Sequence, residues 1–343
     1  MAASSPSAAP PQPLVFEPIL KARPWGGDRL ASLLGKHAAD AADARAPVGE
    51  SWELVSLPGE ESRVARGPFA GTTLADIVAA WGPRLTGAAA LADGRFPLLI
   101  KFLDARENLS IQVHPKPAPT RPAGAPAIKH EAWFVIAAEP GSKLYIGEKP
   151  GVTLADFRTA AGTAAMVPLL RAWPAKPGQC YYLPSGTPHA LGAGVLVAEV
   201  QTPSDTTYRL YDWDRPGLDG RPRELHVAAA LENLLLGVPE SEILQPRRHV
   251  GSALTTVTHI CRCERFIIDR LRILEGTRQR MPHLEMAIWI VLAGRGILRR
   301  KTADCPFQTG DVVLIPADSA DIEFEATADC DVLEVLIPIA SSA

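Results

Sequence analysis

The chain contains 343 residues and carries a formal net charge of -3 at pH 7, from 35 basic and 38 acidic side chains. A chain of this length can bury a large core and is expected to hold two domains or more. Because it lacks a basic run, it is not expected to bind nucleic acid. No apolar run approaches the ~20 residues that a membrane span needs, so no membrane association is predicted.

The N-terminal part of the chain combines a polar start with short apolar runs. Residues 1–13 are predicted to form a disordered tail and lack the features of a signal peptide, so the cytoplasm is the expected compartment. Residues 14–16 and 49–55 read as strands bounded by turn signals. Between them, 38–46 is rich in alanine and aspartate and could be a loop or a frayed helix. Residues 72–82 predict a helix, because apolar side chains recur at helical spacing and Gly-Pro follows.

Strands are predicted to return in the middle of the chain, at 96–103, 109–114 and 132–137. Each of these segments is rich in β-branched, aromatic or other apolar residues. The intervening segment 116–126 holds four prolines and a glycine. It is therefore predicted to be a loop, and its place in the chain suggests that it overhangs the candidate site described below.

Two further helices are expected beyond this loop, at 153–172 and 223–237. The first is weakened by an internal glycine and proline, and the second is ended by Gly-Val-Pro. Strands are predicted between them at 179–183 and 195–201. Residues 238–258 read as a linker, because they show neither helical nor strand periodicity.

The last segment, 259–343, is predicted to consist of strands and turns, and it repeats an earlier pattern. Residues 310–316 and 178–184 both read glycine, five residues, proline. Each copy follows an apolar strand that an acid opens, Glu131 in the first and Glu285 in the second. The simplest interpretation is a duplicated β-barrel unit, with helices inserted in the first copy.

The fold prediction is therefore a mainly β protein with helical insertions and two barrels. The first barrel would span 14–237 and the second 259–343. The two copies differ at one informative position, since Asp321 stands where the first copy has His189. The second barrel is therefore predicted to be degenerate and to bind no metal.

Four side chains form a candidate metal site in the first barrel. The stretch that ends at His189 reads G-x5-P-x-G-x2-H, which places a histidine just past a turn at a strand entrance. Gln112 and His114 are two apart on a strand and face the same way. With Glu131 they make an N/O ligand set that zinc and similar divalent ions accept, leaving a position for water or substrate. Two alternatives remain: Glu131 could pair with Lys129, and Gln112 could merely orient a water.

Arg209 is the strongest candidate for binding an anion. It lies on an apolar and aromatic strand, where a buried arginine needs a negative partner. The competing interpretation is a structural ion pair with Asp205 or Asp212. His226 has no visible partner and is interpreted as structural. Three more residues could supply donors at the rim of the pocket: Ser110, Lys116 and Arg215.

Several stretches in family order resemble the type I phosphomannose isomerases of the cupin superfamily. They cover roughly residues 20–340 and are most similar to the shorter bacterial form. The matching runs are Arg-Pro-Trp-Gly-Gly (23–27), Gly-Glu-Ser-Trp-Glu-Leu (49–54), Phe-Pro-Leu-Leu-Ile-Lys-Phe-Leu-Asp (96–104), Leu-Ser-Ile-Gln-Val-His-Pro (109–115), Lys-His-Glu-Ala-Trp (129–133), Pro-Ser-Gly-Thr-Pro-His-Ala-Leu (184–191), the segment 201–215 and Arg-Glu-Leu-His (223–226).

This resemblance implies two cupin-type β-barrels (jelly rolls) and a zinc-dependent aldose–ketose isomerase that interconverts mannose 6-phosphate and fructose 6-phosphate. It also implies a role for nine residues. These are the zinc ligands Gln112, His114, Glu131 and His189, the catalytic residues Arg209 and Lys129, and the substrate-binding residues Ser110, Arg215 and Trp25. Lys116 departs from the family pattern, where Asp or Asn often follows His-Pro, which puts the loop over the pocket in doubt.

The implied chemistry suits these residue types. Moving a carbonyl between C1 and C2 requires proton transfer and stabilisation of an enediolate, which a divalent metal and Arg209 can supply. Glu131, Lys129 and a metal-bound water are all candidate bases, and the sequence does not choose between them. The alternative functions are a non-catalytic sugar-binding cupin and another metal-dependent cupin enzyme, such as a dioxygenase. The physiological metal, the oligomeric state and the breadth of sugar specificity stay open.

Overall fold

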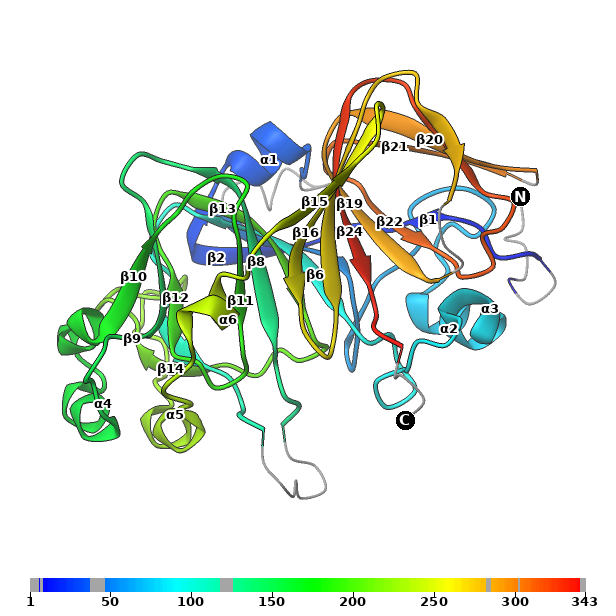
Figure 1. Cartoon of the computed structure of the whole chain (residues 1–343). Coiled ribbons are helices and arrows are strands. Elements are labelled where there is room, and N and C mark those ends of the chain that lie inside the picture. The colour runs from blue at the N-terminus through cyan, green and yellow to red at the C-terminus, as the bar shows by residue number, and fades with distance from the viewer. Residues whose placement is uncertain are drawn as a thin grey trace.

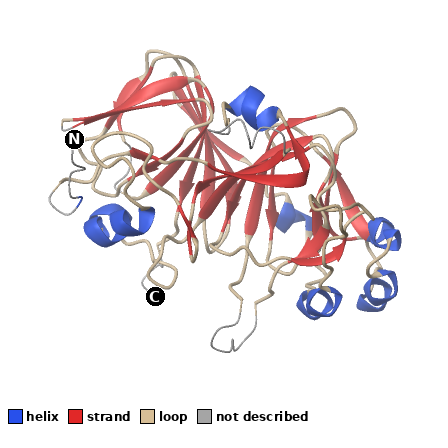
Figure 2. Cartoon of the chain, turned by 180° about the vertical axis from the view of Figure 1, so that it is seen from behind, coloured by secondary structure: helices blue, strands red, loops and turns tan. Residues whose placement is uncertain are grey.

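Stacked β-sheets make up most of the protein, and the helices lie at its periphery (Figures 1 and 2). The computed structural model describes residues 6, 9–37, 47–117, 126–281, 285–301 and 303–339. The segment 38–46, expected to be a loop or frayed helix, lies outside these residues. Among the described residues, no helix is long and apolar enough to cross a bilayer.

The half of the molecule that contains the candidate site is built from two sheets. The five-stranded sheet has the order β10 (Leu170–Pro174), β9 (Lys143–Glu148), β12 (His189–Leu191), β7 (Ile111–Val113), β14 (Tyr208–Tyr211). The six-stranded sheet has the order β11 (Cys180–Leu183), β8 (Glu131–Ala138), β13 (Val195–Gln201), β6 (Leu99–Ala105), β2 (Ile19–Gly27), β3 (Val48–Leu54). A short hairpin extends from this half: β4 (Ser56–Leu57) and β5 (Glu60–Glu61).

The other half is also built from two sheets. The seven-stranded sheet has the order β1 (Leu14–Val15), β22 (Val312–Ile315), β19 (Ala287–Ala293), β24 (Cys330–Leu336), β17 (Ile267–Ile273), β16 (Thr255–Arg262), β15 (Arg248–Gly251). The four-stranded sheet has the order β18 (Arg278–Arg280), β23 (Glu323–Ala326), β20 (Arg295–Arg300), β21 (Ala303–Gln308). The helices are α1 (Arg29–Leu34), α2 (Leu74–Trp81), α3 (Pro83–Thr86), α4 (Leu154–Ala160), the 3-10 helix η3 (Ala164–Leu169), α5 (Val227–Asn233) and α6 (Glu240–Ile243).

The central strands are buried on both faces, which joins the two halves through one core. In β13, Leu196 and Ala198 belong to the core shared with the seven-stranded sheet, whereas Val195 and Val197 face the five-stranded sheet. Because successive side chains of a strand point to opposite faces, a continuous apolar run of this kind suits a strand covered on both sides. The six- and seven-stranded sheets therefore pack face to face in the middle of the molecule.

The two halves share the same pattern of strand pairing. Four neighbouring strands correspond between the halves. In the six-stranded sheet their order is β11, β8, β13, β6, and in the seven-stranded sheet it is β22, β19, β24, β17. Trp133 lies opposite Glu199 and donates to it, and Trp289 likewise lies opposite Glu334 and donates to it. This internal repeat agrees with the predicted duplication. The strand pairing also shows which residue of one half corresponds to which residue of the other, and the sequence pattern alone does not.

That register corrects the predicted match between Glu131 and Glu285. Leu183 pairs with Glu131 in the first half, and the equivalent Ile315 pairs with Ala287 in the second. The second half therefore carries an alanine where the first carries its candidate ligand. The predicted equivalence of Glu131 and Glu285 was wrong by two residues. A shift of two residues leaves every side chain on the same face of the strand, so the alternation of side chains in the sequence does not reveal it.

The structure also differs from the predicted segments at several points. β1 pairs with β22 and so belongs to the sheet of the second half, although it was predicted in the first. The backbone N–H of Ala317 donates to Leu85, so the end of the helical segment near 72–82 also contacts the second half. The predicted linker 238–258 instead carries α6 and β15. In the predicted tail, residues 11–13 are buried against the protein, whereas 1–5 and 7–8 lie outside the described residues.

The helix predicted at 153–172 is much shorter than expected. Thr153 caps α4 with a reciprocal bond to Asp156, and the helix ends at Ala160. Gly162 has φ +77°, which breaks the helix, and η3 and β10 follow. The internal glycine noted in the sequence therefore lies just past the end of the helix, and the internal proline, Pro168, falls inside η3. α5 likewise spans only the centre of the helix predicted at 223–237.

Trp289 provides a test of whether the second half is independent of the site. Its ring is 1% exposed and packs edge-on against Phe307 and Phe324. Trp289→Ala is expected to lower the free energy of unfolding by about 3–5 kcal/mol, because it leaves a cavity in this core. Urea denaturation measures the loss, with the exposed Leu274→Ala as a near-neutral control. The amount of metal bound per folded chain should stay unchanged. If the variant loses metal, the second half is not independent of the candidate site.

Candidate active site and metal centre

One row of side chains crosses the five-stranded sheet and defines one wall of the candidate site. His189 on β12 lies directly opposite Gln112 on β7, and Gln112 lies opposite Arg209 on β14. Residues that face one another across neighbouring strands project to the same side of a sheet. The pairing of three strands that are distant in sequence therefore aligns two candidate ligands and the candidate anion-binding arginine.

A second row, on the six-stranded sheet, supplies the other wall. Trp133, Glu199 and Lys101 lie opposite one another on β8, β13 and β6. Glu131, two residues before Trp133, faces the same side. Side chains from both rows line a cavity of about 620 Å³, within the usual range for small-molecule sites.

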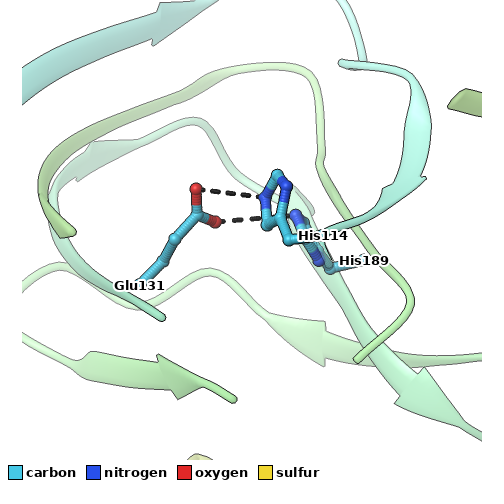
Figure 3. A group of neighbouring side chains, drawn as sticks. All are labelled: His114, Glu131 and His189. Carbon is cyan, nitrogen blue, oxygen red and sulfur yellow. Dashed lines mark ion pairs between the residues drawn. The ribbon is translucent and has the colours of Figure 1, made fainter. Parts of the chain in front are cut away.

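His114, Glu131 and His189 form a buried cluster beside this cavity (Figure 3). His114 Nε2 lies 3.2 Å from Glu131 Oε1, and His189 Nε2 lies 3.5 Å from Glu131 Oε2. Their candidate ligand atoms all lie within 4.8 Å of one another. Each side chain is about 1% exposed, so water does not compensate for poor pairing within the cluster.

The hydrogen bonds of the two histidines determine which ring nitrogen faces the cluster. His114 Nδ1 lies 2.8 Å from the carbonyl oxygen of Thr206, and His189 Nδ1 lies 2.8 Å from that of Thr187. A carbonyl only accepts, so each Nδ1 carries the proton and each Nε2 of a neutral ring presents a lone pair. This is the arrangement that metal-binding histidines commonly adopt.

The charges of the cluster fit a bound cation. Burial lowers the pKa of His114, and burial followed by the nearby His114 lowers the pKa of His189 to about 3, so both rings are neutral at pH 7. Their lone pairs therefore face a carboxylate that also only accepts, although Lys129 Nζ lies 3.4 Å from His114 Nε2 as well. Glu131 Oε2 is buried without a hydrogen-bond partner. A divalent cation among these atoms would satisfy all three residues, so the donor set fits a zinc-like metal.

Lys129 and Gln112 complete the immediate surroundings of the cluster. Lys129 Nζ lies 2.6 Å from Glu131 Oε1, so the ion pair considered from the sequence is present next to the cluster. Burial alone would raise the pKa of Glu131, but Lys129 and His114 outweigh it and hold the pKa well below its usual range. The Gln112 amide nitrogen lies 3.2 Å from His189 Nε2, and rotating the amide by 180° presents its oxygen instead.

Arg209 is free of the structural ion pairs that the sequence left open. Asp212 instead pairs with Arg215 and Arg223, and Asp205 is exposed. Among the described residues, Arg209 forms no ion pair, and its Nε is buried without a hydrogen-bond partner. Arg209 also lines the cavity. An unpaired, half-buried guanidinium at a cavity wall is suited to bind an anionic or strongly polar ligand.

The other predicted site residues divide into two groups. Trp25 and Ser110 line the cavity, and Ser110 donates to the Gln112 amide. Lys116 and Arg215 are not among the residues that line it. Arg215 pairs with Asp212 at 2.9 Å, so its placement does not support the predicted substrate contact. His226, interpreted as structural and without a visible partner, accepts a hydrogen bond from the backbone N–H of Arg209 at 3.3 Å and also lines the cavity.

Sequence reasoning missed six charged residues that line the cavity: Arg23, Glu50, Lys101, Glu199, Asp219 and Arg223. Lys101 and Glu199 each stand within an apolar strand, and a charge at such a position requires a buried partner. That signal could have identified them. Burial followed by the nearby Glu131 raises the pKa of Glu199 to about 7.

Fold and site together define a mainly β protein with a candidate metal centre beside a cavity that both acidic and basic side chains line. A family model of the type I phosphomannose isomerase catalytic domain matches residues 14–159. The chain is 32% identical over 325 residues to mannose-6-phosphate isomerase ManA of Bacillus subtilis, covering 93% of this chain and 98% of that protein. It is 30% identical over 316 residues to the mannose-6-phosphate isomerase of Streptococcus mutans, covering 92% and 95%. The chain belongs to the type I phosphomannose isomerase family.

The comparison of folds agrees with this assignment. The crystal structure of the mannose 6-phosphate isomerase from Bacillus subtilis matches with a TM-score of 0.83 and 30% identity, covering 95% of this chain and 100% of that one. A putative mannosephosphate isomerase from Archaeoglobus fulgidus matches with a TM-score of 0.72 at 21% identity, which supports the fold alone.

Proposed function

We propose that this protein is a zinc-dependent isomerase that interconverts mannose 6-phosphate and fructose 6-phosphate. The observation that carries the proposal is the buried cluster of His114, Glu131 and His189 beside a cavity that Glu131 and the unpaired Arg209 line. The relatives at 30–32% identity are named for acting on mannose 6-phosphate. An anionic sugar, a metal and a guanidinium are the three components that this cavity can bring together.

Four residues would hold the metal: His114, Glu131, His189 and Gln112 through its amide oxygen. Two imidazoles, a carboxylate and a neutral oxygen form a donor set that zinc accepts. When bound, the metal supplies Lewis acidity that polarises the sugar oxygens. The carbonyls of Thr206 and Thr187 orient the two rings for this role through their Nδ1 atoms.

The side chains of the chain can perform the remaining chemistry. Arg209 would neutralise negative charge that develops on O1 or O2 of the sugar, because a fixed cation aimed at developing charge stabilises the transition state. Lys129 is a buried proton donor, because the carboxylates of Glu131 and Glu199 outweigh its burial and raise its pKa. Glu199, with a pKa of about 7, can take up and release a proton near neutral pH. Lys129, Glu131 and Glu199 are thus the candidates for moving the proton.

The proposed architecture is a pair of cupin-type β-barrels, the first metal-binding and the second degenerate. The repeated order of strands supports it, as does the alanine at 287 in place of the carboxylate at 131. In this proposal the second barrel starts near residue 246 and also includes β1. A cytoplasmic location remains the expectation from the sequence.

A coupled assay for fructose 6-phosphate, run before and after chelation, tests the proposal. Activity on mannose 6-phosphate should fall by more than about 100-fold with the chelator and return with stoichiometric zinc, because Arg209 and the proton-transferring residues alone lack the Lewis acid. The same assay without mannose 6-phosphate is the blank. If the zinc-loaded protein binds mannose 6-phosphate without turning it over, it is a sugar-binding cupin and not an isomerase.

A further inference from the structure

Arg223 is held against the cavity by a single carboxylate. Its Nε donates to Asp212 Oδ2 at 2.7 Å and its Nη2 donates to Asp212 Oδ1 at 2.5 Å. This two-point contact fixes the plane of the guanidinium as well as its position. Arg223 lines the cavity, whereas Arg215, the other partner of Asp212, does not. The Asp212 carboxylate therefore holds two arginines, and of these two only Arg223 lines the cavity.

The backbone around Asp212 is strained and tightly held. Trp213 and Asp214 have φ of 60° and 52°, in the left-handed region that non-glycine residues rarely adopt. Trp213 Nε1 donates to the carbonyl of Leu109 at 2.7 Å, and the Tyr211 hydroxyl donates to Asp214 at 2.8 Å. Surrounding contacts that hold a costly conformation of this kind are typical of functional segments. They fix Asp212 at the end of β14.

The ion pairs on this side of the cavity leave the Arg209 guanidinium without a partner. Asp212 pairs with both Arg215 and Arg223, Arg215 also pairs with Glu107 at 3.7 Å, and Arg209 has no ion-pair partner among the described residues. Asp205 and Asp219 also line the cavity, but among the described residues neither forms an ion pair with Arg209 or Arg223. Arg209 and Arg223 both line this cavity, and burial followed by the charge of Arg223 lowers the pKa of Arg209. Two guanidiniums in one cavity wall, one of them without an ion-pair partner among the described residues, are suited to bind an anionic ligand.

The two arginines reach the cavity from different segments of the chain. Arg209 lies opposite Gln112 and is therefore adjacent to the cluster, where the carbonyl end of a sugar would be placed. Arg223 reaches the cavity from the loop that follows β14, beyond Arg209 in the chain. A phosphorylated sugar carries its dianion at the end opposite the reacting carbons, so the two ends require two separate cationic contacts.

We propose that Arg223, oriented by Asp212, binds the phosphate of the sugar phosphate and determines the preference for phosphorylated over free sugars, and that Arg215 serves only to hold Asp212. This inference rests on the proposed isomerase function. It assigns the phosphate to Arg223 in place of Arg215, which the resemblance implied as a substrate-binding residue. Asp212 is thus a positioning residue that acts through Arg223.

Steady-state kinetics of Arg223→Ala test the assignment. The KM for mannose 6-phosphate is expected to rise about 10- to 100-fold, the loss of a charge-assisted contact, while kcat changes by less than about threefold. The inhibition constant of inorganic phosphate should rise by a similar factor, whereas the affinity for free mannose should not change. Arg221→Ala, an exposed arginine of the same loop, is the matched control, and Arg215→Ala should raise KM by less than about threefold.

Two further variants separate a contact from a structural effect. Arg223→Lys keeps the charge but loses the two-point contact with Asp212, so an intermediate KM is expected even if Arg223→Ala fails to fold. Asp212→Asn should also raise KM, but by only a small further factor in the Arg223→Ala background, because both changes act on one guanidinium. Thermal unfolding of each variant reports stability separately, and a purely structural role would lower Tm without altering the preference for phosphorylated sugar.

Three results would overturn the assignment: an unchanged KM in folded Arg223→Ala, a larger effect of Arg215→Ala, or equal losses for mannose 6-phosphate and mannose. Failure of the underlying function is distinguishable, because the zinc-loaded wild-type protein would then show no turnover at all. In that case phosphate affinity, measured by calorimetric titration with inorganic phosphate, still tests whether Arg223 binds the anion.

Discussion

Replacement of His189 by alanine should abolish stoichiometric metal binding and lower kcat by at least about 1000-fold. His189 is 1% exposed and offers one of three converging candidate ligand atoms, and its Nδ1 lies 2.8 Å from the carbonyl oxygen of Thr187. A ligand of this kind has no substitute within the cluster, and catalysis that relies on a Lewis acid is lost with the metal. Metal analysis of the purified variant and the fructose 6-phosphate assay measure the two effects separately.

The matched control is His249→Ala, which removes an exposed histidine whose ring contacts Thr258 on a neighbouring strand. It should retain both metal and activity. Thermal unfolding of the metal-free forms checks that His189→Ala remains folded. If this variant still binds one metal per chain with unchanged affinity, His189 is not a ligand and the metal lies elsewhere.

Arg209→Ala should lower kcat by about 100- to 1000-fold and leave the metal content unchanged. Arg209 contributes no ligand atom and has no ion-pair partner to release among the described residues, so its loss removes mainly the charge that faces the substrate. Removing one fixed group that stabilises developing negative charge typically costs about 2.7–4 kcal/mol, which corresponds to this range. Single-turnover and steady-state rates with mannose 6-phosphate measure the effect.

Arg171→Ala is the appropriate comparison, because Arg171 pairs with Glu240 and a backbone carbonyl away from the cavity. Guanidine added to Arg209→Ala offers a second check, since a small cation that enters the vacated space should restore part of the rate. Near-normal turnover in Arg209→Ala would instead assign Arg209 a structural role and remove the main support for its part in the mechanism.

Much of the secondary structure could be predicted, because its signals are local. The strand at 195–201 was predicted with the observed bounds, and α2 forms where apolar residues recur at helical spacing. The helix at 153–172 was overestimated, since its apolar pattern continues past Gly162 while the backbone at that glycine does not. A local pattern reports which side chains are apolar, and not where the backbone leaves the helix.

The candidate site was predictable to the extent that each residue carried its own signal. His114, Glu131 and His189 stood out by residue type beside turns and apolar strands, and the structure places them in one cluster. Arg223 and Lys101 were missed because their significance depends on partners more than ten residues away, Asp212 and Glu199. Spacing along the chain does not reveal such pairs.

The sequence by itself determined the mainly β character, the duplicated strand pattern and the residue types of the metal cluster, since alternation, turn residues and ligand chemistry are properties of short segments. Only the tertiary structure decided that β1 joins the second half, that Ala287 and not Glu285 is equivalent to Glu131, and that Arg223 faces the cavity while Arg215 does not. The reason is physical: register and strand partners depend on contacts between segments far apart in the chain, and a shift of two residues leaves every local pattern intact.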